Sequence, residues 1–401
     1  MIFSLQPAMN YLFYIPFVYC INLGLSKKFL LNPYYLFSIT LLSIITYNPR
    51  FSLFLISIPL DIYFIIFLGT MSFLLGMITA DKFQKTKVSD EKINVRTLQR
   101  KLFWIVLFLG LTPHIIGFIN VGIPILNADN LDEIRLNYLP TGLSYFIFFL
   151  PLTILVAYTN KNKKLIILSI ILNGLISIIK VSKFDILIFI IFLLFSHLKY
   201  GKSFRLNNKY VSAIGVFFAI PFIFDWFYNL RNLDSPNLNF FLSNTLISES
   251  LSNAISLPYL YFTTSWSNLT QTISNVTEFN YGVYTLFPFI SAFQMDHLIS
   301  YNSLKLIYMH PFNTFAFITD YYMDFGIIGV ISIPFITGIL VFSSYKKCIT
   351  VSNPIKDGQF LILAIPTLML FFSNHFTSVG YPFIVYILYG LLGILLKIKL
   401  K

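Results

Sequence analysis

Long apolar runs separated by short polar loops dominate the chain. A transmembrane helix needs about 20 mostly apolar residues, because the hydrocarbon core of a bilayer is about 30 Å thick. On this rule the pattern predicts about eleven spans, within a range of ten to twelve, and the apolar run 51–58 makes twelve possible. The expected spans lie near residues 8–25, 30–47, 58–80, 102–121, 142–159, 165–180, 184–198, 210–225, 315–343, 359–373 and 382–397. The pattern therefore predicts an all-α polytopic membrane protein in which residues 1–401 form a single integral membrane domain.

Two polar segments interrupt this pattern, at residues 120–141 and 226–314. Loops as long as the second are uncommon in compact domains and are usually functional. Within it, Phe, Tyr, Leu and Ile alternate with Ser, Asn and Thr, as in NTLISESLSNAISLPYLYFTTSW. This composition predicts amphipathic helices that lie on the membrane face and cap the helix bundle. The apolar run 283–294 is too short to span and is a candidate re-entrant segment.

The 28 Lys and Arg residues orient the predicted spans. Most of them fall in alternate loops on one face, and loops rich in Lys and Arg stay in the cytoplasm. This places the N-terminus and the segment 226–314 outside, and the C-terminus in the cytoplasm. Six cations fall on the outer face against this bias: Arg50, Arg135, Lys180, Lys183, Arg231 and Lys305.

The composition excludes several classes of protein. With 57% hydrophobic and 11% charged residues, the chain is neither a soluble globular protein nor a disordered one. The net charge of +12 sits in short loops, so it indicates membrane topology and contact with anionic lipids rather than nucleic acid. No Walker loop, G-x-G-x-x-G, H-E-x-x-H or C-x-x-C motif is present, and the five histidines are scattered. We therefore expect no metal site and no cofactor.

Three cationic positions on the outer face are candidates for binding an anion. Arg135 lies among acidic residues, so it either forms a local ion pair or presents its planar fork to a phosphate. Lys180 and Lys183 flank a tight turn, where snorkelling helix ends are the alternative. Arg231 opens the long loop, where a surface ion pair is the alternative. Taken together, these positions predict an anionic ligand on this face.

Two carboxylates mark the outer end of the span 315–343. Asp320 and Asp324 are four residues apart and therefore share one face of a helix. Acids near the membrane boundary are costly unless they face protein or water. They either make hydrogen bonds at a helix end or line a cavity. Gly326, Gly329 and Gly338 follow, and small residues of this kind allow close helix packing.

Three sets of residues together resemble the Wzy-type O-antigen polymerases, which join oligosaccharide repeat units in bacterial envelopes. The likeness lies in the order and spacing of degenerate motifs over roughly residues 100–345. The motifs are the GIPIL turn with Arg135 downstream and a glycine opening the next span; YLYFTTSWSNL followed by Tyr281-Gly282 and Thr285; and Asn313-Thr314 followed by Asp320, Asp324-Phe-Gly326 and Gly329.

The resemblance implies a metal-independent membrane glycosyltransferase with a GT-C-like fold in the bacterial inner membrane. Its active site would face the periplasm, and its substrates would be oligosaccharides linked to undecaprenyl pyrophosphate. A regulator of chain length is a further candidate partner. The arginines usual in two periplasmic loops of the family correspond to Arg135 and Arg231. The chain departs from the family pattern at Phe146, where some members have glycine, and at Lys180 or Lys183, where many have arginine.

The resemblance also suggests roles for the candidate residues. Cations at Arg135, Arg231, Lys180 and Lys183 would stabilise the departing pyrophosphate. The candidates for a general base are Asp320, Asp324, Asp225, Glu249 and His310. Tyr138, Tyr281 and Trp266 would stack on sugar rings, and His310 and Asn313 would contact the substrate.

Two other functions stay open. One is an O-antigen ligase, which has a similar architecture. The other is a flippase or transporter of the same lipid-linked unit, a class that favours pseudo-symmetric halves and charges at the midplane of the membrane. The sequence has no internal repeat, and one long outer loop dominates it.

Overall fold

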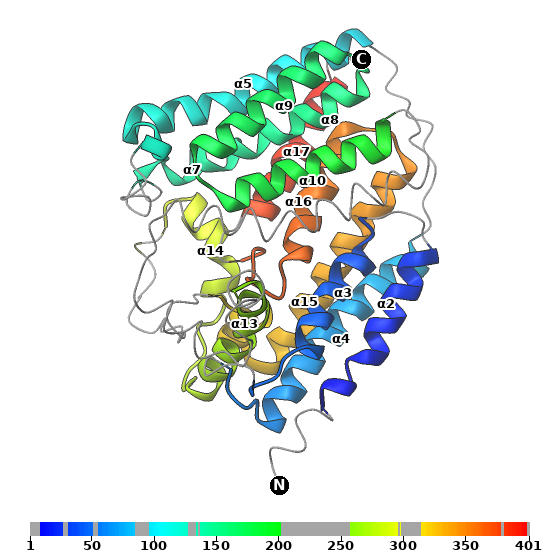
Figure 1. Ribbon diagram of the computed structural model, residues 1–401, viewed down its shortest axis with the longest axis vertical. Coiled ribbons are helices and arrows are strands. Elements are labelled where there is room, and N and C mark those ends of the chain that lie inside the picture. Colours follow the sequence, from blue (N-terminus) through cyan, green and yellow to red (C-terminus); the bar gives the residue numbers. More distant parts are fainter. Residues whose placement is uncertain are drawn as a thin grey trace, which may run out of the picture. The chain divides into compact units, whose positions relative to one another are not determined.

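The computed structural model is helical throughout the regular elements it describes (Figure 1). It describes residues 9–26, 31–50, 55–84, 96–126, 134, 137–201, 257–295, 297, 314–377 and 381–398. Within these ranges every expected span overlaps a helix, although the expected span 359–373 runs five residues past the end of a helix at Leu368. The expected span 210–225 lies outside the described ranges. The chain divides into two compact units. Unit 1 comprises Met1–Val88, Ser235–Thr350 and Ile362–Ile384, and unit 2 comprises Ser89–Asp234, Val351–Leu361 and Val385–Lys401.

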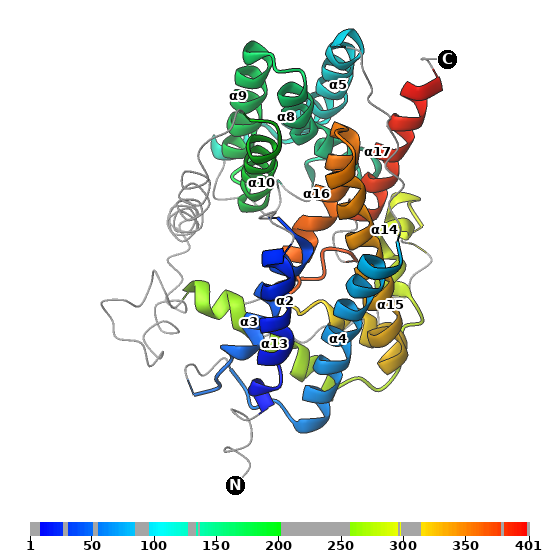
Figure 2. The ribbon, with the colours of Figure 1, turned by 90° about the vertical axis from the view of Figure 1, so that its right-hand side faces the viewer.

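Unit 1 is built on one long helix and its neighbours. Its helices are α2 (Tyr14–Ser26), α3 (Pro33–Ile45), α4 (Leu60–Phe83), α13 (Leu257–Ser274), α14 (Val283–Ala292) and α15 (Ile318–Thr350). Figure 2 shows α4 and α15 side by side, and these two helices form the most extensive helix contact within the described residues.

Unit 2 is built from one long helix and several shorter helical elements. These are α5 (Arg96–Val121), α7 (Thr141–Ser144), η3 (Tyr145–Phe148), α8 (Phe149–Thr159), α9 (Lys163–Ile179) and α10 (Lys183–Tyr200). The local sequence explains two helix starts, because the side chains of Asn162 and Ser182 accept hydrogen bonds from backbone N–H groups in the first turns of α9 and α10. Two further helices, α16 (Pro354–Leu368) and α17 (Tyr381–Ile398), contribute residues to both units.

Four described helical stretches are long and apolar enough to cross a bilayer. They are Leu60–Phe83, Arg100–Leu126, Gly142–Thr159 and Ile318–Thr350. Shorter apolar helices include Pro33–Ile45 and Val283–Ala292. The structure thus agrees with a helical membrane protein, while the expected eleven spans and the GT-C-like fold stay predictions.

Glycines bring the backbones of α4 and α15 together. A Cβ atom at Gly76 would lie 2.1 Å from the carbonyl oxygen of Phe335, and one at Gly338 would lie 2.3 Å from that of Phe73. Such close contacts are possible only without a side chain. In a bilayer the hydrophobic effect does not drive helices together, so close packing of this kind stabilises their association instead. The expectation that Gly338 allows close packing is confirmed.

Two other glycines sit at a break in α15. Gly326 has φ 60° and ψ −143°, a conformation that only glycine adopts readily. The break brings Gly329 so close to the preceding turn that a Cβ there would lie 2.3 Å from the carbonyl oxygen of Tyr321. Gly326 and Gly329 therefore shape α15 itself rather than its contact with another helix.

Two lysines from loops assigned to the cytoplasm are structural cations. Lys346 Nζ donates hydrogen bonds of 3.0 Å to the carbonyl oxygens of Ala80 and Gln84, which satisfies the C-terminal end of α4. In unit 2, Lys199 Nζ lies 2.5 Å from the carboxylate of Asp357, which is fully buried at the start of α16. Each lysine thus fixes a helix end.

The helix α13 differs from the expectation. We expected the segment 226–314 to form amphipathic helices on the membrane face, which is wrong for α13 because its polar side chains are buried in unit 1. Some hydroxyls donate back to the carbonyl four residues earlier, as Thr270 does to Trp266. Others reach neighbouring segments: Ser267 lies 2.7 Å from the Tyr47 hydroxyl, and Asn268 donates to the carbonyl of Thr314 at 2.8 Å. The buried polar residues of α13 are Thr263, Thr264, Ser265, Ser267, Asn268, Thr270 and Thr272.

Candidate functional site

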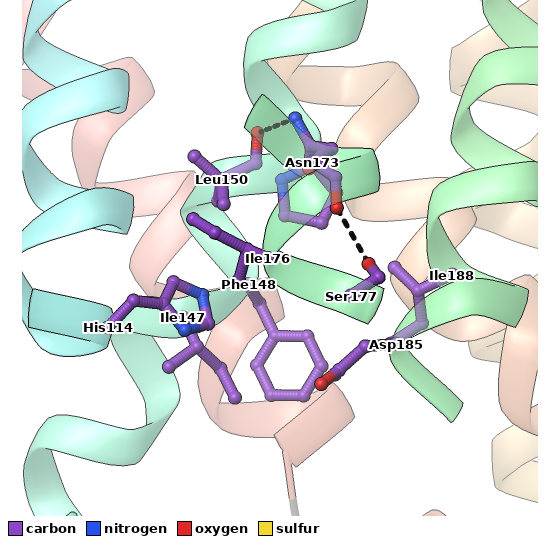
Figure 3. Close-up of a pocket in the computed structure, with 10 residues that line it drawn as sticks. His114, Ile147, Phe148, Leu150, Asn173, Ile176, Ser177, Asp185 and Ile188 are labelled. Carbon is purple, nitrogen blue, oxygen red and sulfur yellow. Dashed lines mark hydrogen bonds between the residues drawn. The ribbon is translucent and has the colours of Figure 1, made fainter. Parts of the chain in front are cut away.

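Unit 2 contains a small cavity that both polar and apolar side chains line (Figure 3). Its volume of about 20 Å³ is enough for one water-sized group. The polar lining comes from α5, α9 and α10 and consists of His114, Asn173, Ser177 and Asp185. The apolar lining consists of Ile147, Phe148, Leu150, Pro151, Ile176 and Ile188. We call this the unit 2 cavity.

An ion pair borders the unit 2 cavity at the turn between α9 and α10. Lys180 caps the C-terminus of α9, and its ammonium pairs with the carboxylate of Asp185 in the first turn of α10. Cations at helix C-termini and anions at N-termini are both favoured by the helix dipole. The ammonium also lies 5.4 Å from the centroid of the Tyr138 ring. The structure thus brings Tyr138 and Lys180 together, while the side chain of Lys183 lies outside the described part.

Tyr138 is held among buried groups rather than presented to solvent. Its ring fills the space left by Gly117, where a Cβ would lie 2.4 Å from the ring. Its hydroxyl lies 3.3 Å from His114 Nδ1. Burial raises the pKa of Tyr138 above the ordinary value, so this hydroxyl stays protonated. The interpretation of Tyr138 as a sugar-stacking ring does not match this position, because an ammonium already lies over the ring.

Sequence reasoning missed His114 and Asp185. His114 stands in an apolar run without a motif, and it meets Tyr138 only because α5 packs beside the segment before α7. Asp185 had a local signal, since an acid in the first turn of a helix after a serine cap is a common helix start. That signal indicates a helix start and not a cavity.

Unit 1 contains a second polar cluster around Asp320. This carboxylate is buried near the start of α15 and accepts a hydrogen bond from the hydroxyl of Thr377. Close by, the hydroxyl of Tyr321 donates to Asn374 Oδ1 at 3.4 Å. Asn374 and Thr377 belong to a non-helical stretch, 369–377, between α16 and α17, and its last four residues are buried. Non-helical backbone inside a membrane protein occurs where it is buried in protein or lines a cavity.

Asp324 has a different environment from Asp320. Its two carboxylate oxygens accept hydrogen bonds from the backbone N–H groups of Tyr284 at 3.1 Å and Thr285 at 2.6 Å, in the first turn of α14. The backbone N–H of Tyr281 also donates to the carbonyl oxygen of Asp324 at 3.1 Å. Asp324 therefore caps α14 from a separate helix. Asp324 thus makes hydrogen bonds at a helix end, but this end belongs to α14 and not to the helix that carries Asp324.

The two other aromatic candidates differ in their exposure to solvent. Tyr281 is 81% exposed, whereas Trp266 is fully buried and its indole N–H donates to Ser43 Oγ at 3.0 Å. The structure therefore places Trp266 in the core of unit 1 and leaves Tyr281 as an accessible ring. The remaining candidates lie outside the described residues: Arg135, Arg231, His310, Asn313, Asp225 and Glu249.

His375, in the stretch between α16 and α17, predicts a pH dependence of stability. Burial lowers its pKa from 6.5 to about 4, so the imidazole is neutral in the folded protein. In the unfolded protein the imidazole takes up a proton below about pH 6.5. The contribution of His375 to the free energy of unfolding is therefore complete above that pH and is lost as the pH falls toward 4. This difference in pKa between the unfolded and folded protein corresponds to about 3 kcal/mol in the free energy of unfolding. We expect His375→Gln to flatten the fall in melting temperature between these pH values; an unchanged slope would contradict the prediction.

Comparisons with protein-family models, with curated proteins and with solved structures find no match. Among the described residues, no group of three or more His, Cys, Asp or Glu side chains is placed to hold a metal ion. A functional proposal therefore depends on the arrangement of the residues themselves and on the motif resemblance.

Proposed function

We propose that the protein is a membrane glycosyltransferase that polymerises oligosaccharide repeat units linked to undecaprenyl pyrophosphate, on the periplasmic face of the bacterial inner membrane. The observation that supports this most is the position of Asp320, a carboxylate buried at the start of a long apolar helix and held by Thr377. An ionisable group in such a place is costly and usually has a function.

In this reaction the acceptor hydroxyl attacks the anomeric carbon of the donor sugar, and the bond from that carbon to pyrophosphate breaks. The hydroxyl proton passes to a general base, and the bonding electrons leave with the pyrophosphate. Asp320 is the carboxylate best suited to accept the proton, because backbone N–H groups already occupy both oxygens of Asp324.

The developing charge on the pyrophosphate needs fixed cations. Arg135 and Arg231 are the first choices, because a guanidinium binds phosphate through two parallel hydrogen bonds. Lys180 is a weaker choice than the sequence indicated, since its charge is compensated by Asp185. Among the aromatic candidates, the exposed ring of Tyr281 is suited to stack on a sugar.

A flippase or transporter of the same lipid-linked unit is the second candidate. Two observations favour it: the break in α15 at Gly326 and the non-helical stretch 369–377. Discontinuous helices build the substrate sites of many transporters. The ligase alternative shares the donor and the leaving group with the polymerase, so only its product distinguishes it.

Deletion of the gene followed by gel analysis of surface polysaccharide separates these functions. A single repeat unit on the lipid core indicates loss of a polymerase. Free lipid-linked polymer with bare core indicates a ligase. Absence of both products from the surface indicates a flippase.

In the deletion strain, we expect Arg135→Ala to abolish long glycan chains while the amount of protein stays normal. Loss of one fixed group that stabilises transition-state charge typically lowers the rate about 100- to 1,000-fold. Arg50→Ala is the matched control, because Arg50 is another outer-face cation but lies away from any motif. Long chains of normal abundance from Arg135→Ala would contradict the proposed role.

A further inference from the structure

The hydrogen bonds around the unit 2 cavity leave mainly acceptors facing it. Asn173 Nδ2 donates to the carbonyl oxygens of Ser169 at 2.8 Å and Leu150 at 3.3 Å, and to Thr153 Oγ1 at 3.3 Å. Ser177 Oγ donates to the carbonyl oxygen of Asn173 at 2.8 Å. The donors of both side chains are thus engaged, while the amide oxygen and the hydroxyl lone pairs can still accept.

The charge at the unit 2 cavity is balanced. Asp185 supplies a carboxylate to the lining, and the ammonium of Lys180 pairs with it from the border. An anion in the cavity would lie against this carboxylate and the neutral acceptors, which repel it. A group with an O–H bond would instead satisfy the same acceptors.

We propose that the unit 2 cavity is a subsite for one hydroxyl group of an uncharged sugar in the glycan, with Asp185 as the principal hydrogen-bond acceptor. This inference rests on the proposed function and specifies the part of the substrate that this site recognises. The volume of about 20 Å³ matches a single hydroxyl group, and a water molecule would take its place without substrate. Lys180 then orients Asp185 and does not bind pyrophosphate.

Three variants, each expressed in the deletion strain, distinguish this role from two others. The other roles are anion binding by Lys180 and a purely structural ion pair. We expect Asp185→Asn to reduce polymer at least tenfold, because the amide brings donors to the hydroxyl and leaves Lys180 uncompensated. Lys180→Met keeps the acceptor and is expected to reduce polymer only a few-fold. The double variant is expected to behave like Asp185→Asn.

Two patterns overturn the proposal. If Lys180→Met abolishes polymer while Asp185→Asn retains it, the lysine binds an anion. If the double variant restores normal polymer, the ion pair is only structural. The amount and melting temperature of each purified variant are measured in parallel, so that loss of folding is recognised.

A pair of serine variants tests the cavity without changing any charge. Ser177→Ala removes an acceptor from the lining and is expected to lower polymer about fivefold, the effect of one hydrogen bond. Ser169→Ala is the matched control on the same helix, because its hydroxyl donates to the carbonyl of Ile166 and does not line the cavity. Equal polymer from both variants overturns the proposal, even where Asp185→Asn does not fold. Unchanged glycan after gene deletion overturns the proposed function itself.

Discussion

Asp320→Asn is expected to abolish polymer formation while leaving the protein folded. Asparagine has the same shape and can still accept the hydrogen bond from Thr377, but it cannot take a proton from the acceptor hydroxyl. Loss of a general base typically lowers a rate about 100- to 10,000-fold. The measurement is the chain-length distribution in the deletion strain, together with the melting temperature of the purified variant.

Asp324→Asn is the matched control, one helical turn further along α15. Here asparagine keeps one acceptor but turns an NH₂ group toward a backbone N–H of α14, which leaves that donor unsatisfied. We expect a loss of about 1–3 kcal/mol in the free energy of unfolding. Polymer should then fall only as far as the amount of folded protein falls. Normal chains from Asp320→Asn would exclude Asp320 as the base.

Gly76→Ala is expected to have the largest effect on stability. The added Cβ would lie 2.1 Å from the carbonyl oxygen of Phe335, so α4 and α15 must move apart along a contact between two long spans. Overpacking of this kind costs about 1–3 kcal/mol, and a clash with backbone belongs at the upper end. Thermal unfolding in detergent measures the loss.

The matched control is Gly174→Ala in α9. The nearest atom to its added Cβ would be 3.8 Å away, in the ring of Phe189. Alanine favours helix over glycine by about 1 kcal/mol, so this variant should melt at the same temperature or higher. A melting temperature for Gly76→Ala that matches Gly174→Ala would contradict the close approach of α4 and α15.

Hydrophobic runs predicted the positions of the helices well, because a run of apolar residues is a local signal that needs no tertiary information. The glycine contact at Gly338 could also be anticipated, since small residues in a span have few other uses. The role of Asp324 could not be anticipated from the sequence. Its partners, Tyr284 and Thr285, lie about forty residues earlier in the chain, and no local pattern predicts that α14 docks there.

The interior position of α13 could not be predicted from the sequence, for a different reason. Alternation of polar and apolar residues indicates two faces, but it does not say whether water or protein satisfies the polar face. In α13 the partners are Tyr47, Thr314 and the helix's own carbonyls. The unit 2 cavity has the same character, since His114 and Asp185 stand seventy-one positions apart and meet only after folding.

The structural lysines affect any attempt to map sidedness by chemical labelling. Lys180, Lys199 and Lys346 each have an ammonium engaged in an ion pair, with side chains only 13–15% exposed. An amine-reactive, membrane-impermeant reagent would therefore modify them poorly from either side. The exposed lysines in the turn before α9 and at its start are better reporters: Lys161, Lys163 and Lys164. Protection of a lysine in such an experiment then reports burial as readily as it reports the compartment.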